Sequence, residues 1–159
     1  MARVLIVGCG CRGRTLAREL AGAGHAVRGT TRRPSRVPDI EAAGVEAAVA
    51  DPDRLGTIVA QLAGVSVVCW LMGTVDADSA ADLHGPRLRT LLERLVDTPV
   101  RGVVYEAAGS VDPDRLSAGA AAVRQAGATW RMPAEVVEVA PSDPEAWLAA
   151  MKAAVGRLL

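Results

Sequence analysis

The sequence alternates between short apolar runs and longer segments in which apolar residues recur every three or four positions. Apolar runs of this length are typical of strands buried on both faces, and the longer period is typical of amphipathic helices. Leu88, Leu91, Leu92 and Leu95 give the clearest helical period. We therefore predict strands over residues 3–7, 26–31, 45–50, 65–71, 100–105 and 128–132.

Helices are predicted between these strands, and a short additional extended piece is expected at residues 136–139. Strands that alternate with helices indicate βαβ units, right-handed crossovers and a parallel sheet. We therefore predict an α/β fold with a doubly wound, Rossmann-like sheet of six parallel strands in the order 3-2-1-4-5-6. A chain of 159 residues fits one domain, residues 1–159. The predicted helices cover residues 12–23, 39–43, 53–62, 77–96, 112–126 and 144–159, and Gly85-Pro86 either interrupts or begins the helix at 77–96.

Charge and composition narrow the possible partners. The 18 basic and 18 acidic residues cancel, so no broad positive field is expected to attract nucleic acid or a membrane surface. Residues 55–75 carry no charge and are long enough to span a bilayer, but glycines and polar residues interrupt them. We interpret this stretch as the end of a helix, a turn and a buried strand.

The cysteines and the N-terminus bear on the compartment. Three cysteines are an odd number without disulfide-framework spacing, and the first apolar run is too short for a signal peptide. We therefore expect a reduced, cytoplasmic setting.

The strongest chemical signal is the sequence GCGCRG at residues 8–13, which matches G-x-G-x-x-G between a predicted strand and a predicted helix. In this context Gly8 permits the tight turn, Gly10 lets a pyrophosphate approach the backbone, and Gly13 lets the helix pack close to the strand. Free N–H groups at the helix start then face the negative charge. A glycine-rich turn without a ligand is the alternative. The predicted phosphate-binding residues are Gly8, Cys9, Gly10, Cys11, Arg12 and Gly13.

The end of the second strand indicates which dinucleotide binds. NAD sites place a carboxylate there for the ribose hydroxyls, but this strand ends in Thr31, Arg32 and Arg33. Arginine offers the extra phosphate of NADP a charged, forked set of donors. We therefore predict NADP(H) in preference to NAD(H). The alternative is that these arginines are solvated surface residues.

Two further strand ends complete the predicted cofactor site. Asp51 follows the third strand, where it can reach the adenine or cap the next helix, and both interpretations remain open. Leu71, Met72 and Gly73 follow the fourth strand, where the nicotinamide ribose is expected, and Gly73 suggests close backbone approach.

With these motifs, the sequence resembles the atypical and extended branches of the short-chain dehydrogenase/reductase superfamily, in particular its epimerase/dehydratase-like members. The resemblance rests on VLIVGCGCRGRTLARELAGAGHAVRGTTRRP, VADPDRLGTIVAQLAGVSVVCWLMGT, RGVVYEAAGS and ATWRMP, and spans about residues 3–140. It implies an NAD(P)-binding Rossmann fold and hydride chemistry.

The departures from this family concern the catalytic unit. Family enzymes use a serine and a Tyr-x-x-x-Lys pair, in which the tyrosine is the acid/base and the lysine lowers its pKa. Here alanines stand at the expected serine position, and Gly109 lies four residues after Tyr105, the only tyrosine. The chain is also too short for the family's C-terminal substrate-binding portion.

Other side chains have alternative interpretations. Cys9 and Cys11 lack further ligands for a metal, so we expect no metal site and interpret them as small residues of the phosphate loop. His84 either donates a proton near the nicotinamide or packs at a helix start. Glu106 and Ser110 follow the fifth strand, where they can face a substrate or remain solvated.

The sequence therefore predicts an NADP(H)-binding Rossmann protein with two open functions. One is an oxidoreductase that transfers hydride to a small carbonyl-type acceptor, with an unidentified substrate. The other is a non-catalytic module that senses the cofactor's redox state or acts with a partner. Sugar-nucleotide epimerase chemistry is a weaker third interpretation. The last helix can cover the sheet or form a homodimer contact.

Overall fold

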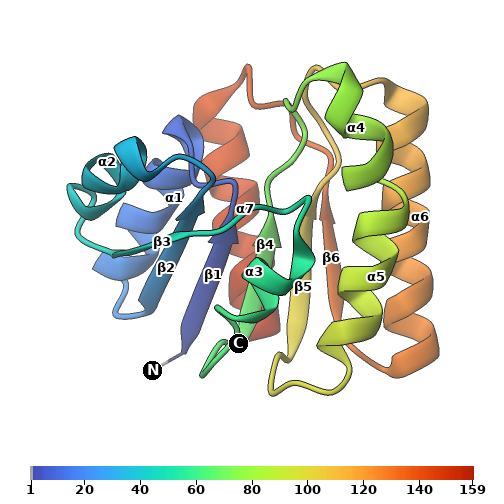
Figure 1. Ribbon diagram of the computed structural model, residues 1–159, viewed down its shortest axis with the longest axis horizontal. Coiled ribbons are helices and arrows are strands. Elements are labelled where there is room, and N and C mark those ends of the chain that lie inside the picture. Colours follow the sequence, from blue (N-terminus) through green and yellow to red (C-terminus); the bar gives the residue numbers. More distant parts are fainter. Residues whose placement is uncertain (1) are drawn as a thin grey trace.

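A six-stranded parallel sheet is the centre of the computed structural model, which describes residues 2–159 (Figure 1). The strand order is β3-β2-β1-β4-β5-β6, and every neighbouring pair is parallel. The predicted Rossmann-like α/β fold class and strand order are thereby confirmed. The strands are β1 (Arg3–Val7), β2 (Ala26–Thr31), β3 (Glu46–Val49), β4 (Val67–Trp70), β5 (Gly102–Glu106) and β6 (Ala134–Val137).

Helices cover both faces of the sheet (Figure 1). They enclose two apolar cores. One core joins the sheet to the helices α1, α2 and α7, and the other joins it to α3, α4, α5 and α6. Because both faces are covered, β4 and β5 are buried along their whole length, and β1 is buried from Val4 to Val7. The helices are α1 (Cys11–Gly22), α2 (Val37–Glu41), α3 (Leu55–Val59), α4 (Ala77–Leu83), α5 (Pro86–Leu95), α6 (Pro113–Trp130) and α7 (Pro144–Leu158), with a 3-10 turn at Pro34–Arg36.

The two-residue period of a strand sends successive side chains of β5 to opposite faces. Val103 and Tyr105 point into the core beneath α5 and α6, whereas Val104 points into the core beneath α1 and α7. Glu106 follows Val104 on the second face and is also fully buried. Adjacent residues at the end of β5 therefore serve different layers.

The predicted sixth strand at residues 128–132 is wrong. This segment is instead the last turn of α6, which continues to Trp130 and ends at Arg131 in the left-handed conformation, with φ of 51°. Pro133 disfavours the helical conformation at Met132, so the helix ends just before these residues. Pro133 then precedes the strand, and its carbonyl accepts a hydrogen bond of 3.1 Å from the Val103 amide. The predicted extra piece at residues 136–139 overlaps the second half of β6 at residues 136–137, and residues 138–139 follow the strand.

The uncharged stretch at residues 55–75 divides as predicted into the helix α3, a turn at Gly64 and the buried strand β4. Within residues 2–159, no helix is both long enough and apolar enough to cross a bilayer. The predicted break at Gly85-Pro86 is also confirmed, because α4 ends at Leu83 and α5 begins at Pro86.

Candidate functional site

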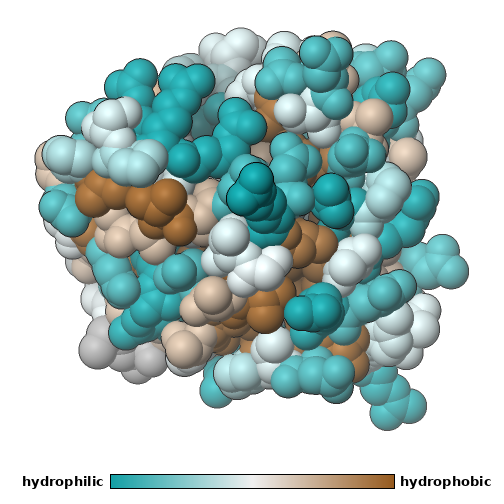
Figure 2. Space-filling model, in the orientation of Figure 1, coloured by the Kyte–Doolittle hydropathy of each residue, from teal (hydrophilic) through white to brown (hydrophobic). Residues whose placement is uncertain are grey.

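A cleft of about 560 Å³ opens at the carboxyl ends of β1, β2 and β4. Open α/β sheets bind ligands at this edge, where the strand order reverses between β1 and β4. In the space-filling view, hydrophilic side chains dominate the upper border of this face (Figure 2). The cleft is lined by Gly8, Cys9, Gly10, Cys11, Arg12, Arg14, Thr30, Thr31, Arg32, Arg33, Arg36, Ala50, Pro52, Leu71, Met72, Thr74, Val75, Asp76, Ser79 and Leu83.

The turn between β1 and α1 forms the middle of the cleft. Gly8 has φ of +83°, and a Cβ there would overlap the Met72 side chain and approach the Leu71 carbonyl. A Cβ at Gly13 would lie 3.2 Å from the Gly8 carbonyl oxygen, so this glycine lets α1 approach β1 closely. Gly10 has no heavy atom within 4 Å of an added Cβ. The open side of Gly10 fits the expected approach of a pyrophosphate.

The start of α1 is suited to an anion. No side chain caps the helix at Gly10, and its first turn holds no acidic residue. The Arg14 amide makes the first intrahelical hydrogen bond, 2.8 Å to the Gly10 carbonyl. The preceding amides of the first turn have no partner within a helix, and the helix dipole adds positive potential there. The turn is held in place by a 2.9 Å hydrogen bond from the Cys9 amide to the Thr30 carbonyl.

Arginines gather at the β2 end of the cleft. The predicted Arg32 and Arg33 are both exposed there, and Arg14 and Arg36 line the same cleft. Arg36 also forms an exposed ion pair of 3.3 Å with Asp39. The sequence interpretation missed Arg14 and Arg36. Their positions in the first turn of α1 and three residues after Arg33 are the signals that would have identified them.

Three predicted cofactor residues, Gly13, Asp51 and Gly73, do not line the cleft. Asp51 accepts a 2.9 Å hydrogen bond from the Asp53 amide. The helix α3 begins after Arg54 without a side-chain cap, so the helix-cap interpretation of Asp51 is wrong.

The close approach expected at Gly73 is made by the protein's own chain. A Cβ at Gly73 would overlap the Ala108 carbonyl oxygen, and a Cβ at Gly109 would overlap the Gly73 backbone. The Val111 amide also donates a 3.1 Å hydrogen bond to the Gly73 carbonyl. The loops after β4 and β5 are therefore in direct backbone contact, which accounts for this glycine without a ligand.

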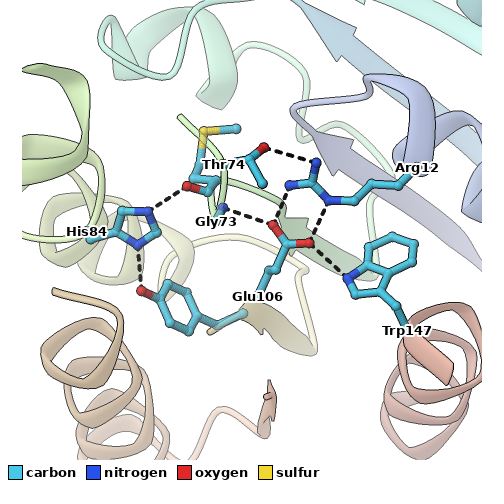
Figure 3. A network of polar contacts seen from close by, with 8 residues as sticks. Arg12, Gly73, Thr74, His84, Glu106 and Trp147 are labelled. Atoms are coloured by element: carbon cyan, nitrogen blue, oxygen red, sulfur yellow. Dashed lines mark hydrogen bonds and ion pairs between the residues drawn. The ribbon is translucent and has the colours of Figure 1, made fainter. Parts of the chain in front are cut away.

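A buried carboxylate joins four elements at the β4 end of the cleft (Figure 3). Glu106 is fully buried, and each of its oxygens accepts two hydrogen bonds. Arg12 donates through Nε at 2.7 Å and through Nη2 at 2.6 Å, which is a forked ion pair. The Gly73 amide and the Trp147 indole nitrogen each donate at 2.9 Å. Sequence reasoning noted Glu106 as a substrate ligand or a solvated residue, and the structure supports neither description.

Arg12 spans the cleft wall instead of pointing freely into it. Its Nη1 donates a 3.1 Å hydrogen bond to the Thr74 hydroxyl, and its guanidinium lies 5.9 Å from the Trp147 ring centre (Figure 3). The Glu106 carboxylate compensates the charge of Arg12, although Arg12 was predicted to bind phosphate.

His84 is enclosed on the other side of the same loop. It is 3% exposed, its Nε2 lies 2.7 Å from the Met72 carbonyl, and its Nδ1 lies 2.5 Å from the Tyr105 hydroxyl. A carbonyl only accepts, so Nε2 carries the proton and Nδ1 accepts from Tyr105. Burial lowers the pKa of His84, whereas burial and the nearby Glu106 raise the pKa of Tyr105. Both groups are therefore neutral near pH 7, and both nitrogens of His84 are used.

The cysteines differ in exposure. Cys9 and Cys69 are buried, whereas Cys11 is exposed in the first turn of α1. Burial raises the pKa of Cys9 to about 11, opposed by the Arg14 charge, and burial raises that of Cys69 to about 12. Within residues 2–159, no three His, Cys, Asp or Glu side chains gather as a metal site.

These features give the cleft a clear division of chemistry. Its centre offers backbone amides to a phosphate, its β2 end offers guanidinium groups, and its β4 end is built from buried, internally paired groups. His84, which the sequence offered as a possible proton donor, is paired with Tyr105. Ser110 is exposed but does not line the cleft.

Comparison with known proteins places this geometry in context. Residues 8–131 match a family described as NAD(P)H-binding. No curated protein sequence matches the chain.

Solved structures share the fold. A short-chain dehydrogenase/reductase superfamily protein from Agrobacterium tumefaciens with bound NAD has a TM-score of 0.70 and 19% identity, covering 86% of this chain and 48% of that chain. Citrobacter sp. triphenylmethane reductase complexed with NADP(H) has a TM-score of 0.66 and 17% identity, covering 86% of this chain and 48% of that chain. A short-chain dehydrogenase from Streptomyces avermitilis has a TM-score of 0.68 and 20% identity, covering 97% of this chain and 84% of that chain. The chain thus spans about half the length of the first two proteins and most of the third.

Proposed function

Because the chain belongs to the NAD(P)H-binding family and has the Rossmann fold of short-chain dehydrogenase/reductase-like proteins, we propose that it binds NADP(H) in the cleft. The diphosphate lies against the uncapped start of α1, beside the open side of Gly10. The adenosine half lies toward β2, and the nicotinamide half lies toward the loop after β4. Leu71, Met72 and Thr74 border the nicotinamide half.

The observation that carries the choice of NADP(H) is the arginine cluster at the β2 end. Arg32 and Arg33 follow β2 directly, and Arg14 and Arg36 line the same cleft. A 2′-phosphate there gains charged donors, whereas the ribose hydroxyls of NAD find no carboxylate at this strand end. Thr31 is engaged locally, because its hydroxyl accepts a 3.1 Å hydrogen bond from the Arg33 amide. We therefore assign selectivity to the arginines.

The bound nicotinamide supplies hydride chemistry to a small carbonyl-type acceptor, and the protein binds and orients the two reactants. The chain's own residues fix the walls of the nicotinamide end through the contacts of Glu106 and His84. With His84 and Tyr105 paired to each other, the proton that a carbonyl acceptor needs comes from water or from the substrate.

A non-catalytic NADP(H)-sensing module is the second candidate. The internal pairing of Arg12 with Glu106, and of His84 with Tyr105, favours it because these groups are already committed within the protein. A partner that brings a substrate-binding portion fits either candidate.

Two measurements test the proposal. Titration calorimetry with NADP⁺ and NAD⁺ is expected to give clearly tighter binding of NADP⁺, and equal affinities would contradict the selectivity. An absorbance assay with NADPH and a panel of aldehydes, ketones, quinones and flavins separates the two candidates. Turnover of any acceptor supports the oxidoreductase, whereas tight binding without turnover supports the module.

A further inference from the structure

The phosphate-binding turn and the loop after β4 are separate walls of the cleft, and one ion pair ties them together. Arg12 belongs to the first turn of α1, and Thr74 follows β4. The guanidinium of Arg12 donates to Thr74 on one side and to Glu106 on the other (Figure 3). Glu106 in turn holds the Gly73 amide at 2.9 Å. Arg12 in α1 is therefore connected to residues 73–74 by two routes, directly to Thr74 and through Glu106 to Gly73.

The environment of this link makes it rigid. Glu106 is fully buried, and its four hydrogen bonds come from Arg12, the Gly73 amide and the Trp147 indole. The Trp147 indole supports the same carboxylate from α7, and the ring of Trp147 lies beside the guanidinium of Arg12. A forked arginine–carboxylate pair fixes direction as well as distance. Buried networks of this kind hold one geometry because breaking them leaves an unpaired buried group.

We infer that Glu106 is a positioning residue for the nicotinamide half of the dinucleotide, and that Arg12 is a structural strut and not a phosphate ligand. This inference rests on the proposed binding of NADP(H). Through Arg12 and the Gly73 amide, Glu106 sets the separation between the phosphate-binding turn and residues 71–74. The adenosine half lies at the other end of the cleft, beside Arg32 and Arg33, and does not depend on this link.

The two possible roles of Arg12 predict opposite effects of the Glu106→Gln variant on the affinity for NADP⁺. The glutamine amide nitrogen can only donate, so it faces existing donors and disrupts the link. A loosened strut weakens NADP⁺ binding. If Arg12 were instead a phosphate ligand held back by Glu106, removal of the carboxylate charge would free it and strengthen NADP⁺ binding.

The experiment compares NADP⁺ with 2′,5′-ADP, which lacks the nicotinamide half, by titration calorimetry. Glu106→Gln is expected to raise the Kd for NADP⁺ on the order of tenfold, and to leave the Kd for 2′,5′-ADP unchanged. Retained binding of 2′,5′-ADP also establishes that the variant is folded. Arg12→Lys keeps the charge but loses the forked geometry, so the same pattern is expected from this less buried position.

The matched control is Glu135→Gln, which removes a carboxylate that pairs with Arg157 at 2.9 Å outside the cleft. Both ligands are expected to bind this variant as they bind the wild type. Tighter or unchanged NADP⁺ binding by Glu106→Gln, or equal weakening of both ligands, overturns the positioning role. A wild-type protein that binds neither ligand overturns the proposed function itself.

Discussion

His84 and Glu106 hold opposite ends of the same peptide group, the bond between Met72 and Gly73. His84 donates to the Met72 carbonyl at 2.7 Å, and Glu106 accepts from the Gly73 amide at 2.9 Å. The two side chains belong to different layers, because His84 lies with Tyr105 beneath α6, whereas Glu106 faces α1 and α7. Residues 71–74 are therefore fixed from both faces of the sheet.

Because His84 is neutral in the folded protein, we expect the protein to lose stability as the pH falls. Burial lowers its pKa below the usual 6.5, so the folded protein binds fewer protons than the unfolded chain. The stabilisation is complete above the unfolded pKa and is lost as the pH falls through the folded pKa. We expect the free energy of unfolding to decrease between about pH 7.5 and about pH 5.5, in urea denaturation at each pH.

The variant His84→Gln tests whether this side chain causes the dependence. His84→Gln is expected to lower stability near pH 7 by about 1–3 kcal/mol and to flatten the pH dependence. An unchanged slope in His84→Gln would show that another group titrates.

We expect the replacement of two helical glycines, Gly119 and Gly156, by alanine to change stability in opposite directions. A Cβ at Gly119 in α6 would overlap the hydroxyl of the fully buried Tyr105, whereas Gly156 in α7 has no heavy atom within 4 Å of an added Cβ. Gly119→Ala is expected to destabilise the protein by about 1–3 kcal/mol through overpacking. Gly156→Ala is expected to stabilise it by about 0.5–1 kcal/mol, because alanine favours the helix.

Thermal or urea unfolding of both variants measures these differences directly. The pair controls for the general gain of alanine over glycine, since both positions are helical. If Gly119→Ala were as stable as Gly156→Ala, then Tyr105 would have room to move, and the geometry of its bond to His84 would not be fixed by packing.

The fold could be predicted from the sequence because its signals are local. A run such as residues 4–7 is apolar at every position, and glycines mark the following turn and the close approach of α1. The prediction of the sixth strand was wrong because local signals conflict there. Residues 128–132 were assigned to a strand that Pro133 ends, whereas the helix continues to Trp130 and Pro133 instead precedes β6.

The candidate site was only partly predictable, because the missing features depend on contacts between distant residues. The phosphate turn and Arg32 follow from a contiguous motif and a strand end. The pairing of Arg12 with Glu106 joins residues 94 positions apart, and a carboxylate after a strand carries no mark of its future partner. Gly73 was singled out correctly for close backbone approach, but its neighbour is the chain at Ala108.

Arg32 is expected to determine cofactor choice under the proposed function. Arg32→Ala is expected to raise the Kd for NADP⁺ on the order of tenfold or more, with little effect on NAD⁺, because only NADP⁺ carries the 2′-phosphate. The effect is expected to shrink at high salt, since Arg32 is exposed. Titration calorimetry of both cofactors at two ionic strengths measures this.

Arg18→Ala is the matched control for the loss of one positive charge. Arg18 is exposed on α1 but does not line the cleft. Its removal is expected to leave both affinities unchanged at moderate ionic strength. Equal losses of NADP⁺ affinity in Arg18→Ala and Arg32→Ala would indicate a general electrostatic attraction and not a specific phosphate contact.

The three cysteines are expected to differ in reactivity. Burial raises the pKa of Cys9 to about 11 and that of Cys69 to about 12, so both remain protonated thiols near pH 8. Cys11 is exposed at the cleft. A maleimide or iodoacetamide reagent is therefore expected to label one thiol in the folded protein and three in urea, as counted by mass spectrometry.

Under the proposed function, NADP⁺ slows the labelling because the diphosphate covers the start of α1. Cys11→Ser is expected to abolish labelling of the folded protein, whereas labelling that persists in this variant would show that a buried thiol, Cys9 or Cys69, becomes exposed.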